Sequence, residues 1–290
     1  REKRYSSHGL RRRDLVAHRV RHPVRWVMVT SAVAAGLVLA GTTAAGQAPA
    51  YRAPRTADGR PNLGGIWQAI GTAHWDIEAH PAGPSQIREL GAAGAVPGGL
   101  GIVEGGPLPY RPEALAKKKD NYANRLTLDP EIKCYLPGTP RATYMPFPFQ
   151  IVQTAKYIMI VYEFAGAVRT IYMDDHVEAP ADSWMGWSNG RWDGDALVVD
   201  TTGFNGMAWF DRAGNFHSDA LHVVERFTAR SPDTLMYEAT IEDPNVFTRP
   251  WKISMPLYRR IEKNVQLLQF RCAEYVEEFF YGELVSPPRD

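Results

Sequence analysis

The residues best suited to chemistry in this sequence gather between positions 211 and 225. His217, Ser218 and Asp219 are consecutive, and His222 and Glu225 follow them closely. A histidine beside carboxylates can act as a general base or bind a divalent metal. The spacing matches no metal-binding motif, however, and residues 222 and 225 of an extended strand fall on opposite faces. We therefore expect a polar loop leading into a strand, and no metal site.

Two other acidic segments raise the same question. Asp174, Asp175 and His176 follow the apolar run IYM, and the segment RWDGDALVVD at 191–200 contains the D-x-D step of a calcium loop. The second segment lacks the glycine and the glutamate that complete an EF-hand loop. Aspartate is favoured in turns for conformational reasons alone. Both segments are therefore interpreted as turns between strands.

Several enzyme classes lack support in the sequence. There is no G-x-S-x-G and no P-loop, and the glycine run at 98–101 is not followed by a helical pattern. Serine hydrolases, nucleotidases and dinucleotide oxidoreductases are thus disfavoured, and no cofactor is predicted. The charged residues that could still line a ligand site at the mouth of a barrel are Arg141, Arg169, Asp174, His217 and Asp219.

Aromatic residues are dense beside prolines, which suits a surface that contacts another protein. In the segment YMPFPF at 144–149 each proline fixes φ and removes a hydrogen-bond donor. Tyrosine and tryptophan are enriched in protein interfaces. The predicted interface residues are Tyr144, Phe147, Phe149, Trp184 and Trp209.

The elements that must position these residues are mainly β-strands. Short β-branched and aromatic runs alternate with turn signals, among them Asn189-Gly190, Asp193-Gly194 and Ser231-Pro232-Asp233. Short connections favour antiparallel pairing, and a sheet of so many strands closes or folds over. We predict an antiparallel lipocalin-like barrel or a β-sandwich. The expected strands are 61–67, 149–154, 157–163, 167–173, 183–188, 196–202, 221–229, 234–242, 248–259 and 265–273.

Two segments before residue 144 break this β pattern. Residues 91–109 are so rich in glycine and proline that we expect a long loop. Residues 112–125 begin with proline and continue with good helix formers, which predicts one short helix.

The N-terminal part differs in composition from the rest. Residues 1–25 hold nine Lys/Arg and two Asp/Glu, and residues 26–45 carry no charge for 20 residues. A run of that length can cross a bilayer, and the basic arm before it is expected to stay in the cytoplasm. Residues 46–60 resemble a tether, and 61–290 form the expected periplasmic domain.

The apolar run allows two interpretations. Small residues before Gln47 resemble a signal-peptidase site near Gly46, which would make the run a cleaved signal peptide. The run is longer than a typical signal core, so we favour a retained signal anchor in the inner membrane. The acidic body after residue 25 disfavours nucleic acid as a partner.

The chain has two cysteines, Cys134 and Cys272, and neither belongs to a C-x-x-C motif. A Cys-based zinc site or covalently attached haem is therefore disfavoured. In an oxidising compartment we expect the two to form a disulfide, although two free buried thiols remain the alternative.

The segments 129–163, 190–205, 211–227 and 233–251 together resemble a family of uncharacterised, exported, β-rich bacterial proteins. The similarity covers about residues 60–275 and implies an extracytoplasmic β domain, without implying an activity. Combined with a retained anchor, the chain also resembles an accessory subunit of a bacterial photosynthetic reaction centre. The resemblance implies the subunits of an integral membrane complex as partners.

These observations predict a non-catalytic accessory subunit that is anchored through residues 26–45 and stabilises a membrane complex from the periplasmic side. The alternative is a secreted small-molecule-binding protein or hydrolase with its site at the barrel mouth. A filled barrel interior would count against that alternative.

Overall fold

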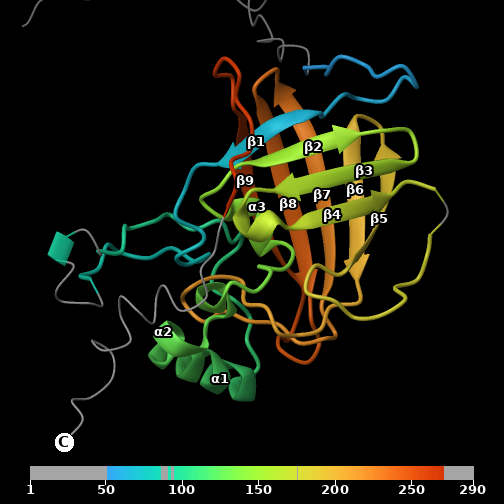
Figure 1. The fold of residues 1–290 in the computed structure, drawn as a ribbon. Helices are drawn as coiled ribbons and strands as arrows, with labels where there is room; N and C mark the ends of the chain where they lie inside the picture. The colour runs from blue at the N-terminus through green and yellow to red at the C-terminus, as the bar shows by residue number, and fades with distance from the viewer. Residues whose placement is uncertain (1–50, 86–90, 93–94, 175, 271–290) are drawn as a thin grey trace, which may run out of the picture. The chain divides into compact units, whose positions relative to one another are not determined.

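A computed structural model describes residues 51–85, 91–92, 95–174 and 176–270 (Figure 1). Its main feature is a closed barrel of nine strands that pair in sequence order. The mainly β prediction is confirmed, and the choice between barrel and sandwich is settled as a barrel. The predicted membrane anchor lies outside the described residues. The strands are β1 (Gly65–Ala69), β2 (Phe149–Gln153), β3 (Tyr157–Tyr162), β4 (Val168–Tyr172), β5 (Trp187–Asp193), β6 (Ala196–Thr202), β7 (His222–Ser231), β8 (Thr234–Glu242) and β9 (Trp251–Arg259).

The odd number of strands has a direct consequence for their directions. A ring of nine strands cannot alternate in direction throughout, so at least one neighbouring pair must be parallel. That pair is β4 and β5, and the other neighbours in the ring are antiparallel. The parallel pair is joined by the long connection 173–186, as a crossover requires. The prediction of antiparallel pairing is therefore correct except at this step.

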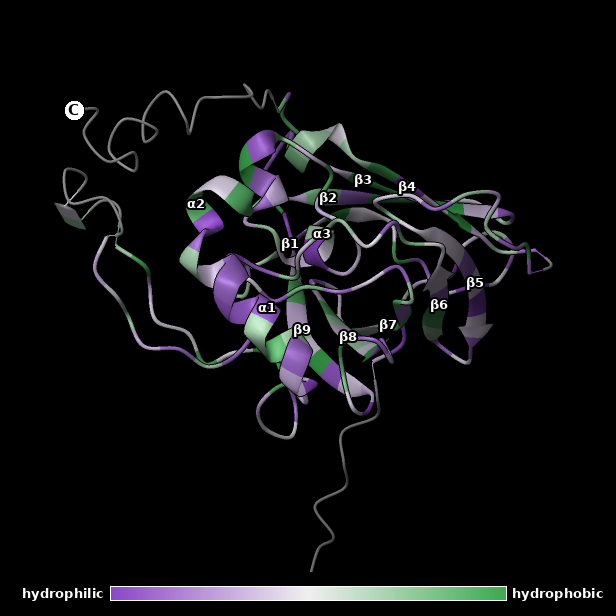
Figure 2. Cartoon of the chain, turned by 90° about the horizontal axis from the view of Figure 1, so that it is seen from below, coloured by the Kyte–Doolittle hydropathy of each residue, from purple (hydrophilic) through white to green (hydrophobic). Residues whose placement is uncertain are grey.

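Side chains alternate between the barrel interior and the surface, as the strand repeat of two dictates. In β8, every second residue from Leu235 to Ile241 is buried. Figure 2 shows hydrophobic and hydrophilic residues mixed along the strands. Large inward side chains, including Trp67, Phe149 and Phe227, are fully buried and belong to one hydrophobic core.

Several predicted boundaries hold and others do not. The predicted strands at 196–202 and 234–242 match β6 and β8. The strand expected at 183–188 is instead β5, which runs through Asn189-Gly190, so the turn predicted there is wrong. Residues 265–270, the described part of the last predicted strand, form no strand.

Gly190 shows why that turn prediction failed. A Cβ atom at this position would lie 2.5 Å from Met173 Sδ and 2.6 Å from Ile171 Cγ2. The glycine is therefore needed for close packing inside the barrel rather than for a turn. The hairpin turn is at Asp193-Gly194, where Gly194 has a φ of +60°.

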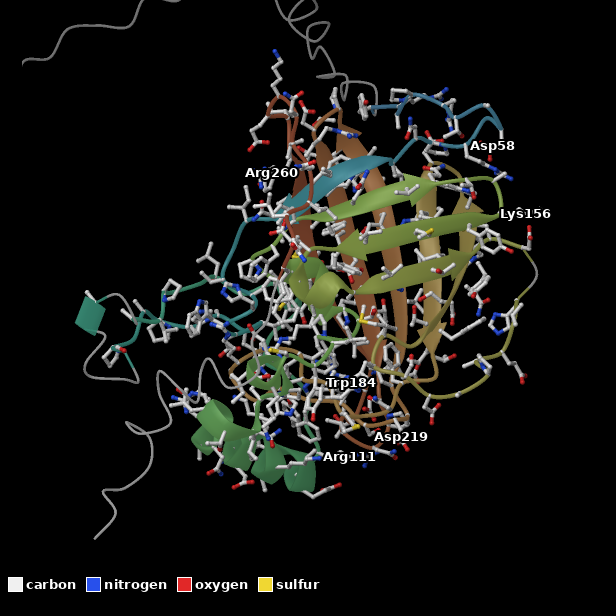
Figure 3. All side chains as sticks on the ribbon, viewed as in Figure 1. Asp58, Arg111, Lys156, Trp184, Asp219 and Arg260 are labelled. Atoms are coloured by element: carbon white, nitrogen blue, oxygen red, sulfur yellow. The ribbon has the colours of Figure 1, made fainter. Side chains whose placement is uncertain are left out.

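The two ends of the barrel are built differently. At the hairpin end lie the turns after β2, β5 and β7, the segment before β1 and the residues after β9. At the loop end, long connections close the barrel, including 70–148 and 203–221. Figure 3 labels Asp58, Lys156 and Arg260 near the hairpin end, and Arg111, Trp184 and Asp219 near the loop end.

Short helices contribute to the loop end. The predicted helix at 112–125 is confirmed as α1 (Pro112–Ala123), with proline in its first turn. It is followed by α2 (Arg125–Leu128), the 3-10 turn η2 (Pro130–Lys133) and α3 (Arg141–Tyr144), while η3 (Phe164–Gly166) joins β3 to β4. None of the helices within the described ranges has the length and apolar character to span a membrane.

Candidate functional site

The outer face of β2, β3 and β4 carries no charge at any of its outward positions, all of which are described. Four of its apolar side chains are markedly exposed: Val168 at 52%, Tyr157 at 44%, Val152 at 42% and Met159 at 39%. Solvent-facing positions of a sheet normally hold polar or charged side chains. We term this set the neutral face. Its outward residues are Gln150, Val152, Tyr157, Met159, Val161, Val168, Thr170 and Tyr172.

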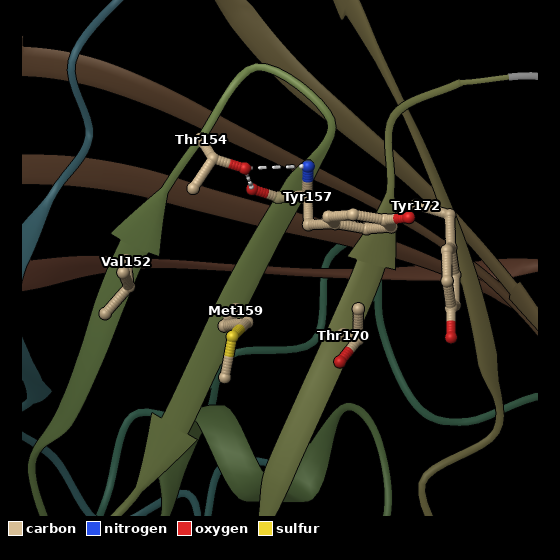
Figure 4. Close-up of a pocket in the computed structure, with 6 residues that line it drawn as sticks. All are labelled: Val152, Thr154, Tyr157, Met159, Thr170 and Tyr172. Carbon is tan, nitrogen blue, oxygen red and sulfur yellow. Dashed lines mark hydrogen bonds between the residues drawn. The ribbon is translucent and has the colours of Figure 1, made fainter.

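A shallow pocket of about 350 Å³ lies on the neutral face (Figure 4). Strand register puts Val152 beside Met159 and Met159 beside Thr170, so these three form a row across the strands. The turn above them is held by Thr154, whose hydroxyl donates to the Tyr157 carbonyl at 2.8 Å and accepts from the Tyr157 N–H at 3.0 Å. The pocket is thus formed by regular strand positions and a braced turn.

Aromatic rings border this pocket. Tyr157 and Tyr172 meet edge to face, with ring centroids 5.6 Å apart, and Tyr172 stacks on Trp187 at 4.5 Å. Such contacts hold amphipathic rings in fixed positions. The face therefore offers a pre-formed surface of aromatic, methionine and valine side chains.

The outer face of β7, β8 and β9 has the opposite character. We term its outward charged or titratable residues, His222, Arg226, Arg230, Glu238, Glu242 and Lys252, the charged face. Register sets His222 opposite Glu242 and Arg226 opposite Glu238, so opposite charges are neighbours across the strands. Such pairing suits contact with water.

Inside the barrel, one polar cluster joins five strands. Arg169 Nε donates to Ser188 Oγ at 2.8 Å, and Arg169 Nη2 donates to Thr201 Oγ1 at 2.8 Å. The Arg169 guanidinium also forms an ion pair with Glu225, which accepts a further hydrogen bond from Tyr237 Oη at 2.8 Å. These residues come from β4, β5, β6, β7 and β8, so the cluster cross-links much of the barrel.

The charges of this cluster are shielded from solvent. Arg169 is 2% exposed and Glu225 is 0% exposed. Burial alone would lower the pKa of Arg169, but the Glu225 carboxylate outweighs it and raises that pKa. Burial also raises the pKa of Tyr237 well above its ordinary value. The groups are held as a charged, mutually satisfied pair rather than as a proton relay.

A second buried ion cluster lies at the loop end. Arg141 donates to both carboxylate oxygens of Asp129, at 2.9 and 3.0 Å, and to Glu131 at 2.5 Å. Arg212 reaches Glu131 from the other side, with Nε donating at 2.9 Å. Burial would raise the pKa of Glu131, but Arg141 and Arg212 lower it to about 2. The cluster fixes the segment 129–141 against the 203–221 loop.

Two titratable groups beside this cluster have shifted pKa values of opposite sense. Burial, followed by the positive charge of Arg212, lowers the pKa of His74 to about 4. Burial, followed by the charge of Asp76, raises the pKa of Asp211 to about 7. Asp211 accepts from the Ile77 N–H at 2.9 Å and thereby ties two loops together. Both groups are explained by their positions in the closed loop end.

The five residues predicted to line a barrel-mouth site lie apart. Arg141 and Arg169 belong to the two separate buried clusters, and His217 is buried at 2% exposure. Asp174 is exposed at the end of β4, whereas Asp219 is exposed in the 203–221 loop. The structure therefore brings these five residues into no common site.

His217 itself is enclosed by aromatic rings. Its Nδ1 lies 2.8 Å from the Ser218 carbonyl, and its ring centroid is 5.3 Å from that of Phe210 and 5.6 Å from that of Phe204. Burial lowers its pKa. His217 in this position packs against the aromatic rings of the loop end.

The remaining acidic candidates take structural roles. His222 faces outward and Glu225 inward, as expected for opposite faces of a strand. In RWDGDALVVD the three carboxylates have different partners: Asp193 pairs with Arg226, Asp195 with Arg55 and Asp200 with His222. Across the described ranges, no group of three or more His, Cys, Asp or Glu residues is arranged to hold a metal ion.

Most of the predicted interface residues lie in the interior. Tyr144, Phe149 and Trp209 are 2%, 0% and 8% exposed, so these three belong to the core, which corrects their assignment to a surface. Phe147 and Trp184 are half-buried, with Phe147 against Phe164 and Trp184 stacked on Tyr135. These aromatic side chains therefore contribute mainly to packing.

The neutral face was not among the predicted sites, although its strands carry a signal in the sequence. In FQIVQ, YIMIVY and VRTIY, every second residue is uncharged even where it must face outward. Cys134 is disulfide-bonded. Its predicted bridge to Cys272 stays a prediction, because Cys272 lies outside the described residues.

Comparison with known proteins assigns no relationship: no protein-family model matches the chain, and no curated protein matches it.

Proposed function

We propose that this chain is a non-catalytic accessory subunit that is anchored in the inner membrane by residues 26–45 and contacts another subunit of a membrane complex from the periplasmic side. The observation that carries the proposal is the neutral face. Eight outward residues on three adjacent strands carry no charge, although a closed barrel needs only its inward positions to be apolar.

The composition of the neutral face fits a protein partner. The centres of protein interfaces are depleted of charged residues and enriched in tyrosine and methionine. Tyr157, Tyr172 and Met159 have this character, and the pocket between them can take a side chain of the partner. Contiguous exposed apolar surface on a soluble domain marks an interaction site.

The buried clusters support a non-catalytic role. The candidate charged residues Arg169 and Arg141 are each paired with buried carboxylates, and His217 is enclosed. A catalytic acid or base must reach its substrate within hydrogen-bonding distance. The resemblance to an accessory subunit of a photosynthetic reaction centre suggests such a centre as the partner complex.

Gentle detergent extraction of native membranes, followed by intact mass measurement of this chain and identification of co-migrating proteins, tests the proposal. We expect an uncleaved chain in a stoichiometric membrane complex. A chain shortened near Gly46 and found alone in the periplasmic fraction would overturn the proposal.

The alternative, a small-molecule-binding protein, has one supporting observation. A hollow of about 430 Å³ lies at the loop end, flanked by the exposed side chains of Ile70 and Leu100. None of the five predicted barrel-mouth residues lines it. Fluorescence of an apolar dye such as anilinonaphthalene sulfonate tests this alternative, since saturable binding lost in Ile70→Asp would favour it.

A further inference from the structure

Positive charge is concentrated at the hairpin end of the barrel. The segments 51–64, 154–157, 173–174, 191–196, 230–234 and 259–264 hold nine Lys/Arg and six Asp/Glu. All other described residues together hold 12 Lys/Arg and 17 Asp/Glu. The barrel therefore has a basic hairpin end and an acidic remainder.

Ion pairing increases this contrast. Four of the six acidic residues at the hairpin end are paired: Asp193, Asp195, Asp233 and Glu262. Six of the cations there are exposed and form none of the ion pairs found among the described residues. These are Arg52, Arg60, Lys156, Arg191, Arg230 and Lys263. Excess positive charge is thus directed to the solvent at this end.

Apolar and aromatic side chains accompany the cations. Ile261 is 74% exposed beside Arg260, and Tyr157 is 44% exposed beside Lys156. Cations next to exposed aromatic and aliphatic groups suit the interface between lipid headgroups and acyl chains.

The chain also enters the barrel at this end. The segment before β1 is fastened there, because Ala53 is buried and Arg55 pairs with Asp195 at 2.7 Å. Five residues, 46–50, separate Tyr51 from the predicted membrane-spanning segment, and that length of chain spans at most about 20 Å. A bilayer crossed by that segment is within reach of the hairpin end.

We infer that the hairpin end rests on an anionic lipid surface, with its six unpaired cations binding lipid phosphates and with Ile261 at the level of the headgroups. This inference rests on the proposed membrane anchor. Each cation near an anionic bilayer changes partitioning by about fivefold, so six cations can hold the barrel against the surface. The neutral face, on the side of the barrel, then remains available to a protein partner.

The test uses the full chain reconstituted in vesicles and labelled with a membrane-impermeant amine reagent, with each lysine followed by mass spectrometry. Lys156 and Lys263 report on the hairpin end, and Lys119 and Lys252 report on other surfaces. In phosphatidylglycerol-containing vesicles, we expect Lys156 and Lys263 to be labelled at least about threefold more slowly than in pure phosphatidylcholine vesicles. Salt of about 0.5 M should remove the difference.

Two matched variants sharpen this test. Arg60→Gln with Arg230→Gln removes two cations but keeps both reporter lysines, and should abolish most of their protection. Lys119→Gln with Lys252→Gln removes two cations elsewhere and should leave protection unchanged. Equal labelling of Lys156 and Lys263 in both kinds of vesicle would overturn the inference.

The anchor is tested separately by an alkaline carbonate wash of the same vesicles. A chain that resists extraction but shows unprotected lysines contradicts only the lipid inference. A chain that is released by the wash contradicts the membrane anchor itself. Protection by a soluble polyanion such as heparin that equals the protection by anionic vesicles would indicate a general polyanion site and overturn the lipid assignment.

Discussion

The neutral face and the charged face belong to the same barrel but have opposite surfaces. Both present the same kind of inward residues, such as Ile160 in β3 and Ile253 in β9, each at most 1% exposed. Outward, β2 to β4 show valine, methionine and tyrosine, while β7 to β9 show paired charges. The inward positions thus determine the barrel, and the outward positions are free to determine what it contacts.

The largest expected effect on stability is that of a substitution in the barrel interior, compared with a substitution on an outer face. Glu225→Gln removes the carboxylate partner of buried Arg169, so the free energy of unfolding should fall by about 3–5 kcal/mol. Glu238→Gln changes an outward carboxylate on the next strand and should alter it by less than about 0.5 kcal/mol. Urea unfolding of both variants measures the difference, and similar losses would contradict the assignment of the barrel's stability to its interior.

A pH effect should likewise come from a buried histidine rather than from one on the charged face. The pKa of His74 is lowered from 6.5 to about 4, so the unfolded chain binds its proton first. The contribution of His74 to stability should therefore fall by up to about 3 kcal/mol as the pH drops from 6.5 to 4.

The His74→Gln variant should lose this contribution, and His222→Gln on the charged face serves as the control. Asp211, with its pKa raised to about 7, gives the opposite slope, because its stability contribution increases as the pH falls from 7 towards 3.8. The quantity to measure is therefore the difference in unfolding free energy between the wild type and each of the two histidine variants, followed across the pH range from 6.5 to 4. An unchanged pH profile in His74→Gln would contradict the prediction.

A charge in the centre of the neutral face should affect binding and leave folding intact. Met159→Arg is expected to weaken association with the partner complex by about 2 kcal/mol or more, because the charge would be buried in the interface. Thr240→Arg adds the same charge at an outward position of β8 and should leave association unchanged. Quantitative co-purification from membranes compares the two, and equal retention would indicate that the neutral face is not the contact surface.

The smallest effect is expected for an exposed ion pair. Arg226→Gln breaks the ion pair with Asp193. The Arg226 side chain is 40% exposed and the Asp193 side chain is 64% exposed. Such exposed pairs contribute little to stability, and salt screens them. Thermal unfolding at low and high salt should show a small loss of stability that disappears with salt, whereas a loss as large as that of Glu225→Gln would give the charged face a structural role.

Much of the barrel could be predicted from the sequence because period-two patterns report burial directly. The strand β8 follows from alternation, β6 follows from a short β-branched run that begins after a turn signal, and α1 follows from a proline before good helix formers. The β5 strand could not be predicted, since the need for Gly190 arises only from contacts with Met173 and Ile171. Local turn signals do not report such distant contacts.

The candidate site was less predictable than the fold. Charged and aromatic residues attracted attention because of their chemistry, yet Arg169, His217 and Phe149 are buried for packing and internal pairing. The neutral face is defined by an absence of charge on positions that face outward, and that direction is known only once register and closure are known.

Site-specific photo-crosslinking in native membranes tests the central claim most directly, with a photoreactive amino acid replacing Met159 in one variant and Thr240 in the other. We expect one defined crosslinked partner from position 159 and none from position 240. Crosslinking from position 240 alone, or equal crosslinking from both positions, would contradict the assignment of the neutral face as the contact surface.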